Sequence, residues 1–227
     1  TKGKGSTAAF CDALLQKARP PGAGKIGLYT SPHMVAARER IRIDGVPISE
    51  ADFAKFFWEV WDRLEQNPHR ALETTPLRPV YFRFMTILAF HVFISLEVSA
   101  TLLEVGIGGM YDSTNIVQHP VVTGVTALGL DHTAILGHTL EEVAWQKAGI
   151  FKPGIPALSV EQPENAQAVL QKYAKQVQAS SFQVVPVNRD LLHVKLGLPG
   201  DHQYSNASLA LELIRTCLLY TSDAADD

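Results

Sequence analysis

Short apolar segments alternate with longer amphipathic ones along most of the chain. The apolar segments are rich in β-branched residues and bounded by Gly, Pro or polar residues, which is typical of buried strands; they are residues 25–30, 100–105, 121–128, 155–160 and 182–187. Helical periodicity predicts helices at about 6–18, 49–66, 82–97, 139–151, 163–178 and 203–216. This alternation predicts an α/β fold in which a doubly wound, mostly parallel sheet is flanked by helices.

Two segments depart from the alternation. Residues 38–48 alternate apolar and polar side chains around the turn pair Asp44–Gly45, which predicts a small hairpin. Its arginines are equally compatible with a solvated surface excursion. Residues 68–80 are rich in proline and are predicted to form a loop.

The chain opens on TKGKGST, which an apolar-periodic stretch follows. Glycines, a lysine and hydroxyls before a helix indicate a phosphate-binding loop, because backbone amides and the helix N-terminus attract anions. The usual loop has its hydroxyl directly after the lysine, whereas Gly5 intervenes here, so Ser6 could equally be the N-cap of an ordinary helix. A strand should precede such a loop, and we expect this first strand to be missing from the sequence.

Polar side chains follow several predicted strands, where ligands of doubly wound folds bind. Ser31 and His33 follow the first strand, Glu104 ends the second, and His132 comes shortly after the third. Mg²⁺ prefers oxygen ligands, so Ser31 and Glu104 are candidate ligands, and histidine is a less usual one. Alternatively, Glu104 pairs with a lysine and His132 donates to a loop carbonyl.

Composition excludes several classes of function. The formal net charge is −3, which gives no broad attraction to nucleic acid or anionic membranes. The apolar run at 87–98 is too short and too polar to cross a bilayer. The two cysteines, Cys11 and Cys217, lack metal-ligand spacing and fit a reducing compartment. We expect a cytoplasmic protein and leave a mitochondrial location open.

The ordered motifs resemble those of the folylpolyglutamate synthases of the Mur ligase superfamily. They are TKGKGST, TSPHMVAARERIRIDG, YFRFMTILAFH, EVGIGGMYDSTN, LGLDHT, WQKAGIFK and HQYSNA. The resemblance extends from Thr1 to about Thr216, and the YFRFMT stretch is more similar to eukaryotic folylpolyglutamate synthases than to dihydrofolate synthases.

The resemblance implies a set of ATP-binding residues and metal ligands. The implied ATP-binding residues are Thr1, Lys2, Gly3, Lys4, Gly5, Ser6, Thr7 and Asn206. The implied metal ligands are Ser31, Glu104 and His132, with two Mg²⁺ sites expected. Lys4, Glu104 and His132 should then surround one metal-bearing polyphosphate.

Further residues are implied for catalysis and substrate binding. Lys147 matches the lysine that is carbamylated in the family, and it joins Lys4, Glu104 and His132 as catalytic. Carbamylation would turn an ammonium into a carboxylate, which is compatible with a neighbouring Mg²⁺; without the resemblance, Lys147 would be read as a surface lysine. Folate would lie near three residues, His33, Arg40 and Arg42.

The activity that the resemblance implies is ATP-dependent addition of L-glutamate to the γ-carboxyl of a folate through an acyl phosphate. Two alternatives stay open: a dihydrofolate synthase, and a noncatalytic nucleotide-binding P-loop module. The small-molecule partners would be folates and L-glutamate, with no nucleic acid or membrane partner and a monomeric parent enzyme.

The sequence departs from the family at its ends. Residues 1–216 match an ATP-binding domain, and we expect the C-terminal glutamate-ligase domain to be absent from this sequence. Residues 217–227 resemble the translated read-through of a sequencing adapter, so we interpret them as a non-native tail. We therefore expect the isolated polypeptide to be poorly soluble and inactive by itself.

Overall fold

The computed structural model describes residues 2–67, 69–70 and 72–223, with side chains described up to residue 219. Contacts between residues divide the chain into two compact units. The first unit comprises Thr1–Ala18 and Val105–Asp227, and the second comprises Arg19–Glu104. The second unit is therefore an insertion between two parts of the first.

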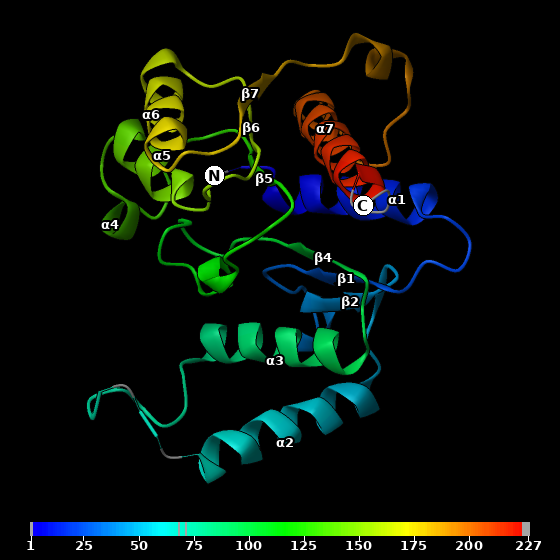
Figure 1. The fold of residues 1–227 in the computed structure, drawn as a ribbon, viewed down its shortest axis with the longest axis vertical. Coiled ribbons are helices and arrows are strands. Elements are labelled where there is room, and N and C mark those ends of the chain that lie inside the picture. The colour runs from blue at the N-terminus through cyan, green and yellow to red at the C-terminus, as the bar shows by residue number, and fades with distance from the viewer. Residues whose placement is uncertain (1, 68, 71, 224–227) are drawn as a thin grey trace. The chain divides into compact units, whose positions relative to one another are not determined.

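The first unit is built around a parallel sheet with the strand order β5-β6-β7 (Figure 1). Its strands are β5 (Thr123–Val125), β6 (Ala157–Val160) and β7 (Phe182–Val185), and its long helices are α1 (Lys4–Ala18), α5 (Leu140–Ala148), α6 (Glu164–Gln176) and α7 (His202–Asp223). Ala157 of β6 packs in the cluster formed with α5 and α6, whereas Leu158 and Val160 pack with Leu209 of α7. Helices thus cover both faces of the sheet, because successive strand residues point to opposite faces.

Helix α1 packs along α7, where the Cys11 thiol lies 3.9 Å from the carbonyl oxygen of Ala210. Short elements complete the unit: α4 (Thr133–Leu136) and the 3₁₀ helices η2 (Ser113–Ile116) and η3 (Arg189–His193). Helix α7 continues without a break through Cys217 to Asp223, so it is longer than the predicted helix. The origin of the tail from residue 217 stays a prediction.

The second unit contains a mixed sheet with the strand order β3-β2-β1-β4. Its elements are β1 (Ile26–Tyr29), η1 (Ala37–Arg40), β2 (Ile41–Ile43), β3 (Val46–Pro47), α2 (Glu50–Gln66), α3 (Tyr81–Ser95) and β4 (Ala100–Leu103). Strand β1 is parallel to β4 and antiparallel to β2. Tyr29 and Ile41 of the sheet pack with Leu88 and Val92 of α3 in one apolar core.

The hairpin between β2 and β3 turns at Asp44 and Gly45, whose φ angles are 51° and 79°. Two successive left-handed residues are the signature of a type I′ turn, which fits the twist of the paired strands. The Asp44 carboxylate accepts hydrogen bonds from the Ile26 amide at 3.0 Å and from the Arg19 guanidinium at 2.7 Å. The turn is thereby attached to the start of β1.

The structure confirms the predicted α/β class, the strands, the long helices and the hairpin, with two differences. The strands are divided between two sheets. Helix α1 begins at Lys4, so Ser6 lies in its first turn and the interpretation of Ser6 as an N-cap is wrong.

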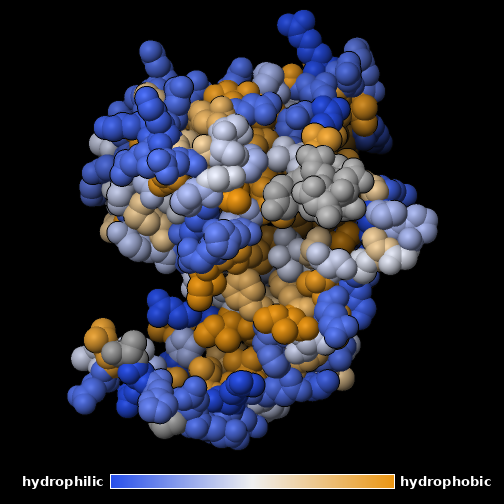
Figure 2. Space-filling view, in the orientation of Figure 1, coloured by the Kyte–Doolittle hydropathy of each residue, from blue (hydrophilic) through white to orange (hydrophobic). Residues whose placement is uncertain are grey.

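The described residues between 68 and 80 form neither helix nor strand, and residues 68 and 71 lie outside the description. Figure 2 shows hydrophilic residues over much of the surface in view, with hydrophobic residues between them. No described helix has the length and apolar character needed to span a membrane.

We expect Asp44→Ala to destabilise the second unit by about 1–3 kcal/mol, because the substitution removes two hydrogen bonds and leaves alanine in a left-handed conformation. Asp44→Asn is the matched control, since asparagine tolerates this backbone conformation and keeps an acceptor oxygen. Urea unfolding of both variants measures the difference, and an equal loss in the two would contradict the assigned role of Asp44.

Candidate active site

The predicted phosphate-binding loop turns directly into α1. Gly3 has a φ of +88°, and the helix starts at the next residue, Lys4. A Cβ atom at Gly3 would lie 2.3 Å from Oδ1 of Asn206 in α7, so only glycine fits there. The first-turn amides of a helix have no intrahelical acceptor, which makes this N-terminus suitable for binding an anion.

Hydrogen bonds attach the loop and the start of α1 to the rest of the unit. The Lys2 amide donates to the Ala127 carbonyl at 2.9 Å, beside the end of β5. Gln203 donates to the Ser6 hydroxyl at 3.4 Å and accepts from Asn206 at 2.9 Å. These contacts bring the predicted residues Lys2, Gly3, Ser6 and Asn206 together.

Thr7 is the next predicted ATP-binding residue after Ser6. Its hydroxyl oxygen is buried and makes no hydrogen bond within the described part of the chain. Gly5 lies with Lys4 in the first turn of α1, and Thr1 lies outside the described residues. The opening motif is therefore present as a compact turn at the N-terminus of α1.

Lys147 is buried on α5, with only 6% of its surface exposed. Its ammonium donates to the Gly108 carbonyl at 3.4 Å. Burial, and secondarily the positive charge of Lys4, lower the pKa of Lys147 from 10.5 to about 8, against the opposing influence of Asp131 and Asp112. The reading of Lys147 as a surface lysine is wrong.

The loop that covers Lys147 is organised by one carboxylate. Asp112 accepts from the amides of Gly106 and Ile107 at 3.1 and 3.2 Å through one oxygen. Its other oxygen accepts from the amide and the hydroxyl of Thr114 at 3.0 and 2.6 Å. Four hydrogen bonds to one side chain fix the conformation of this segment.

Two glycines allow the loop to approach the end of α5 closely. A Cβ atom on Gly109 would lie 2.7 Å from the Gln146 carbonyl oxygen. A Cβ atom on Gly149 would lie 2.4 Å from Cβ of Met110. Both distances are shorter than any normal van der Waals contact, so the packing over Lys147 requires the absence of side chains at Gly109 and Gly149.

His132 precedes α4 in a left-handed conformation, with a φ of +48°. Its amide donates to the Asp131 carboxylate at 2.8 Å, and its ring Nε2 lies 3.9 Å from the other oxygen of Asp131. The imidazole is half-exposed. In the described contacts, the His132 ring thus lies near the Asp131 carboxylate and not near a loop carbonyl.

In the second unit, the parallel pairing of β1 with β4 brings Ser31 and Glu104 together. The Glu104 amide donates to the Tyr29 carbonyl at 2.9 Å, which extends the pairing beyond the strands. The Glu104 carboxylate is buried and accepts from the Ser31 amide at 3.1 Å. The structure thus brings these two predicted residues together where β1 and β4 end.

The predicted folate residues lie in the same unit. Arg40 is buried, and its Nε donates to Nδ1 of His33 at 2.9 Å. Arg42 instead donates to the carbonyls of Glu39 and Gly45 at 3.3 and 3.4 Å. The two arginines therefore have different surroundings.

The predicted site residues are divided between the two units. The first unit holds Lys4, His132, Lys147 and Asn206, and the second holds Ser31, His33, Arg40, Arg42 and Glu104. The idea that Lys4, Glu104 and His132 surround one metal ion spans both units and stays a prediction. Within the described residues, no three His, Cys, Asp or Glu side chains group as a metal site.

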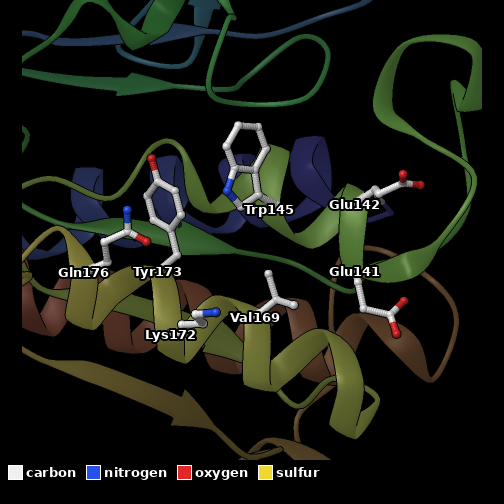
Figure 3. Close-up of a pocket in the computed structure, with 7 residues that line it drawn as sticks. All are labelled: Glu141, Glu142, Trp145, Val169, Lys172, Tyr173 and Gln176. Atoms are coloured by element: carbon white, nitrogen blue, oxygen red, sulfur yellow. The ribbon is translucent and has the colours of Figure 1, made fainter.

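A pocket of about 320 Å³ opens between α5 and α6 and contains none of the predicted residues (Figure 3). Trp145 and Tyr173 project side by side there, with ring centroids 6.3 Å apart. The carboxylate of Glu141, which lines the pocket, already accepts a hydrogen bond from Asn165. We therefore seek the candidate active site among the predicted residues described above and not in this pocket.

Sequence reasoning missed Asp112 and Gln203. Asp112 lies in the quoted stretch GIGGMYDSTN, where an acidic side chain after several glycines was a usable sign of a fixed loop. Gln203 lies three residues before Asn206 on α7, and its contact with Ser6 is visible only once α1 and α7 are packed together.

The known sequences and solved structures that resemble this chain are proteins of one kind. No protein-family model matches the chain. The chain is 48% identical over 233 aligned positions to folylpolyglutamate synthase of Saccharomyces cerevisiae strain YJM789, covering 100% of this chain and 42% of the relative. The chain thus spans less than half the length of that curated relative.

Solved structures of the same kind share the fold. Mycobacterium tuberculosis folylpolyglutamate synthase complexed with ADP has a TM-score of 0.85 at 28% identity, covering 96% of this chain and 52% of that one. An FPGS–AMPPCP–folate complex has a TM-score of 0.83 at 30% identity, covering 98% of this chain and 57% of that one.

We expect Lys147→Met to be more stable than the wild type at pH 7 by on the order of 1–3 kcal/mol, because the wild type must bury an ammonium there. Between pH 8 and 10.5 the unfolded wild type binds more protons than the folded form, so wild-type stability rises with pH and the difference shrinks.

Urea unfolding in CO₂-free buffer at several pH values measures this difference. Lys172→Met, on the exposed side of α6, is the control and should show no such pH dependence. A pH-independent difference for Lys147→Met would contradict the lowered pKa.

Proposed function

We propose that this chain, a relative of the folylpolyglutamate synthases along its whole length, forms the ATP-binding part of an enzyme that joins L-glutamate to the γ-carboxyl group of a folate. The observation that carries the proposal is the 48% identity to the yeast enzyme over all of this chain. The activity belongs to the complete protein, so the activity measurements below concern the complete protein.

The N-terminus of α1 would bind the phosphates of ATP. The amides of its first turn, the Lys4 ammonium and the hydroxyls of Ser6 and Thr7 are suited to anionic oxygens. The unpartnered hydroxyl of Thr7 supports this role, and Asn206, in contact with Gly3, would face the nucleotide. Similar solved structures are complexes with ADP or AMPPCP, which supports a nucleotide as the ligand.

The second unit supplies donors that fit Mg²⁺. The Glu104 carboxylate is buried next to Ser31, and oxygen ligands of this kind are those that Mg²⁺ prefers. Ser31 and Glu104, together with His132 of the first unit, would hold the metal, and two Mg²⁺ sites stay part of the proposal. Bound Mg²⁺ would supply positive charge at the phosphate oxygens.

Lys147 would act as a carbamate. With a pKa of about 8, roughly a tenth of the Lys147 side chain is the neutral amine at pH 7, far more than for a lysine with the ordinary pKa of 10.5. The amine nitrogen forms a bond to the carbon of CO₂ and loses one proton, which leaves a negatively charged carbamate. That change replaces a repulsion between Lys147 and Lys4 by an attraction, which supports the assignment.

The reaction would proceed in two displacements. An oxygen of the folate γ-carboxylate attacks the γ-phosphorus of ATP, ADP leaves, and an acyl phosphate forms. The amine of L-glutamate then attacks the acyl carbon, inorganic phosphate leaves, and an amide remains after loss of a proton. Lys4 would stabilise the charge on the transferred phosphoryl group, because two anions must approach each other in the first step.

Dihydrofolate synthase activity uses the same ATP chemistry on a different acceptor. Supplying the complete protein with dihydropteroate or with a monoglutamyl tetrahydrofolate, each with ATP and L-glutamate, separates the two activities. We also propose a monomeric, cytoplasmic protein, with a mitochondrial pool left open; light scattering and cell fractionation test these points.

We expect Glu104→Gln to lower glutamate ligation by the complete protein about 10²- to 10³-fold, because the substitution removes the buried negative charge that would hold Mg²⁺. The measurement is the rate at which a monoglutamyl folate is converted to the diglutamate. Glu164→Gln at the exposed start of α6 is the control and should keep full activity. A Glu104→Gln variant with wild-type activity would refute the assigned metal role.

A carbamate on Lys147 predicts a ¹³C NMR signal after equilibration of the protein with ¹³C-bicarbonate. Lys147→Ala should lack the signal, whereas Lys152→Ala should keep it, although the pKa of Lys152 is also lowered by burial. Persistence of the signal in Lys147→Ala would show that another amine carries the carbamate.

A further inference from the structure

Three arginines occupy alternate positions in the segment that leads into the hairpin, and one of them has unusual surroundings. Arg38 donates to the Ile48 carbonyl at 3.1 Å, and Arg42 donates to two backbone carbonyls. Arg40 is 7% exposed, and its Nε donates to the ring nitrogen Nδ1 of His33 at 2.9 Å. Its guanidinium is therefore directed at a side chain rather than at the hairpin backbone.

Aromatic rings cover the remainder of the Arg40 guanidinium. Its central carbon lies 5.4 Å from the ring centroid of Tyr81 and 6.0 Å from that of Phe82, distances typical of cation–π contacts. The NH1 nitrogen is buried and has no hydrogen-bond partner within the described part of the chain. Rings and an imidazole thus hold this cation in place, which favours an indirect role over direct capture of a ligand from solvent.

A second set of contacts fixes the loop that follows His33. The Glu39 carboxylate accepts from the amides of Met34, Val35 and Ala36 at 2.9, 3.1 and 2.7 Å. Met34 and Val35 are themselves almost fully exposed. These hydrogen bonds also lower the pKa of Glu39. The loop is therefore held in shape while it faces solvent, as expected of a preformed binding surface.

The hydrogen bond from Arg40 decides where the ring proton of His33 resides. A guanidinium has donors and no acceptor, so Nδ1 must offer its lone pair. The ring proton of the imidazole is then on Nε2, and Nε2 is left as a donor. Arg42, two residues along the chain, donates to backbone carbonyls instead of to His33 in the described structure and so provides a matched comparison.

We propose that Arg40 is a positioning residue that holds His33 as the Nε2–H tautomer, so that His33 donates a hydrogen bond to a carbonyl or carboxylate oxygen of the acceptor substrate. That this substrate is a folate rests on the proposed function. The tautomer itself follows from the contact between Arg40 and His33.

The tautomer is measured directly in long-range ¹H–¹⁵N spectra of the complete protein labelled with [¹⁵N]histidine, without ligand. We expect His33 to show a protonated Nε2 and an unprotonated Nδ1 in the wild type and in Arg42→Met. In Arg40→Met, part of the population should move to the Nδ1–H form. Protonation of Nδ1 in the wild type, or an unchanged tautomer in Arg40→Met, would overturn the proposal.

The working donor is identified in the complete protein by two replacements of His33. The amide nitrogen of glutamine approximates Nε2 and that of asparagine approximates Nδ1. We expect His33→Gln to keep folate affinity within about threefold and His33→Asn to lose about tenfold, as for one hydrogen bond. Equal losses in the two variants would overturn the assignment of Nε2 as the donor.

A double substitution tests whether Arg40 acts through His33. If half of the Nε2–H population is lost, Arg40→Met should weaken folate binding about twofold in the wild type, and it should have no such effect in the His33→Gln background, where no tautomer is left to set. An equal loss in both backgrounds would mean that Arg40 acts independently. Loss of glutamate ligation in every assay would refute the proposed function but leave the tautomer measurement valid.

Discussion

Burial of one lysine beneath a loop is the constraint on which the site in the first unit depends. The loop can lie against the end of α5 only because Gly109 and Gly149 have no side chains at the points of closest approach. Asp112 then holds the loop in that position through four hydrogen bonds. The burial that results keeps the Lys147 amine partly neutral, and this is the property on which its proposed chemistry rests.

In the second unit, the pairing of parallel strands, and not the packing of a loop, brings the candidate site residues together. Parallel strands start and end at common edges of a sheet, so the residues after β1 and β4 are neighbours whatever their separation in the sequence. Ser31 and Glu104 are 73 residues apart and still share a hydrogen bond. The 3₁₀ helix η1 beyond β1 adds Arg40, which contacts His33 and thus joins the start of the hairpin to the same region.

The sequence was most informative where the pattern is local. Runs of β-branched residues located the strands, and Asp44–Gly45 located the turn, because these signals act within a few residues. The division into two sheets was not predictable in this way, since every strand segment shows the same apolar character whichever sheet it joins. The start of α1 at Lys4 was missed because glycine is a poor helix former, and the contact of Gly3 with Asn206 is a tertiary one.

Only part of the candidate site could be predicted from the sequence. The residues that the resemblance implied include the pairs Ser31 with Glu104 and Gly3 with Asn206, which the structure brings into contact. The burial of Lys147 and of Arg40 could not be read from the sequence, because both residues are usually exposed and only packing shows otherwise.

The insertion of one unit within the other has a consequence for biosynthesis. Cys11 of α1 and Ala210 of α7 are in contact although 199 residues separate them. On a translating ribosome, α1 emerges long before α7 exists, and the intervening second unit can complete its own core first. The face of α1 that α7 covers therefore stays without its partner until α7 has been synthesised, so the first unit cannot complete its packing before the whole second unit has been made.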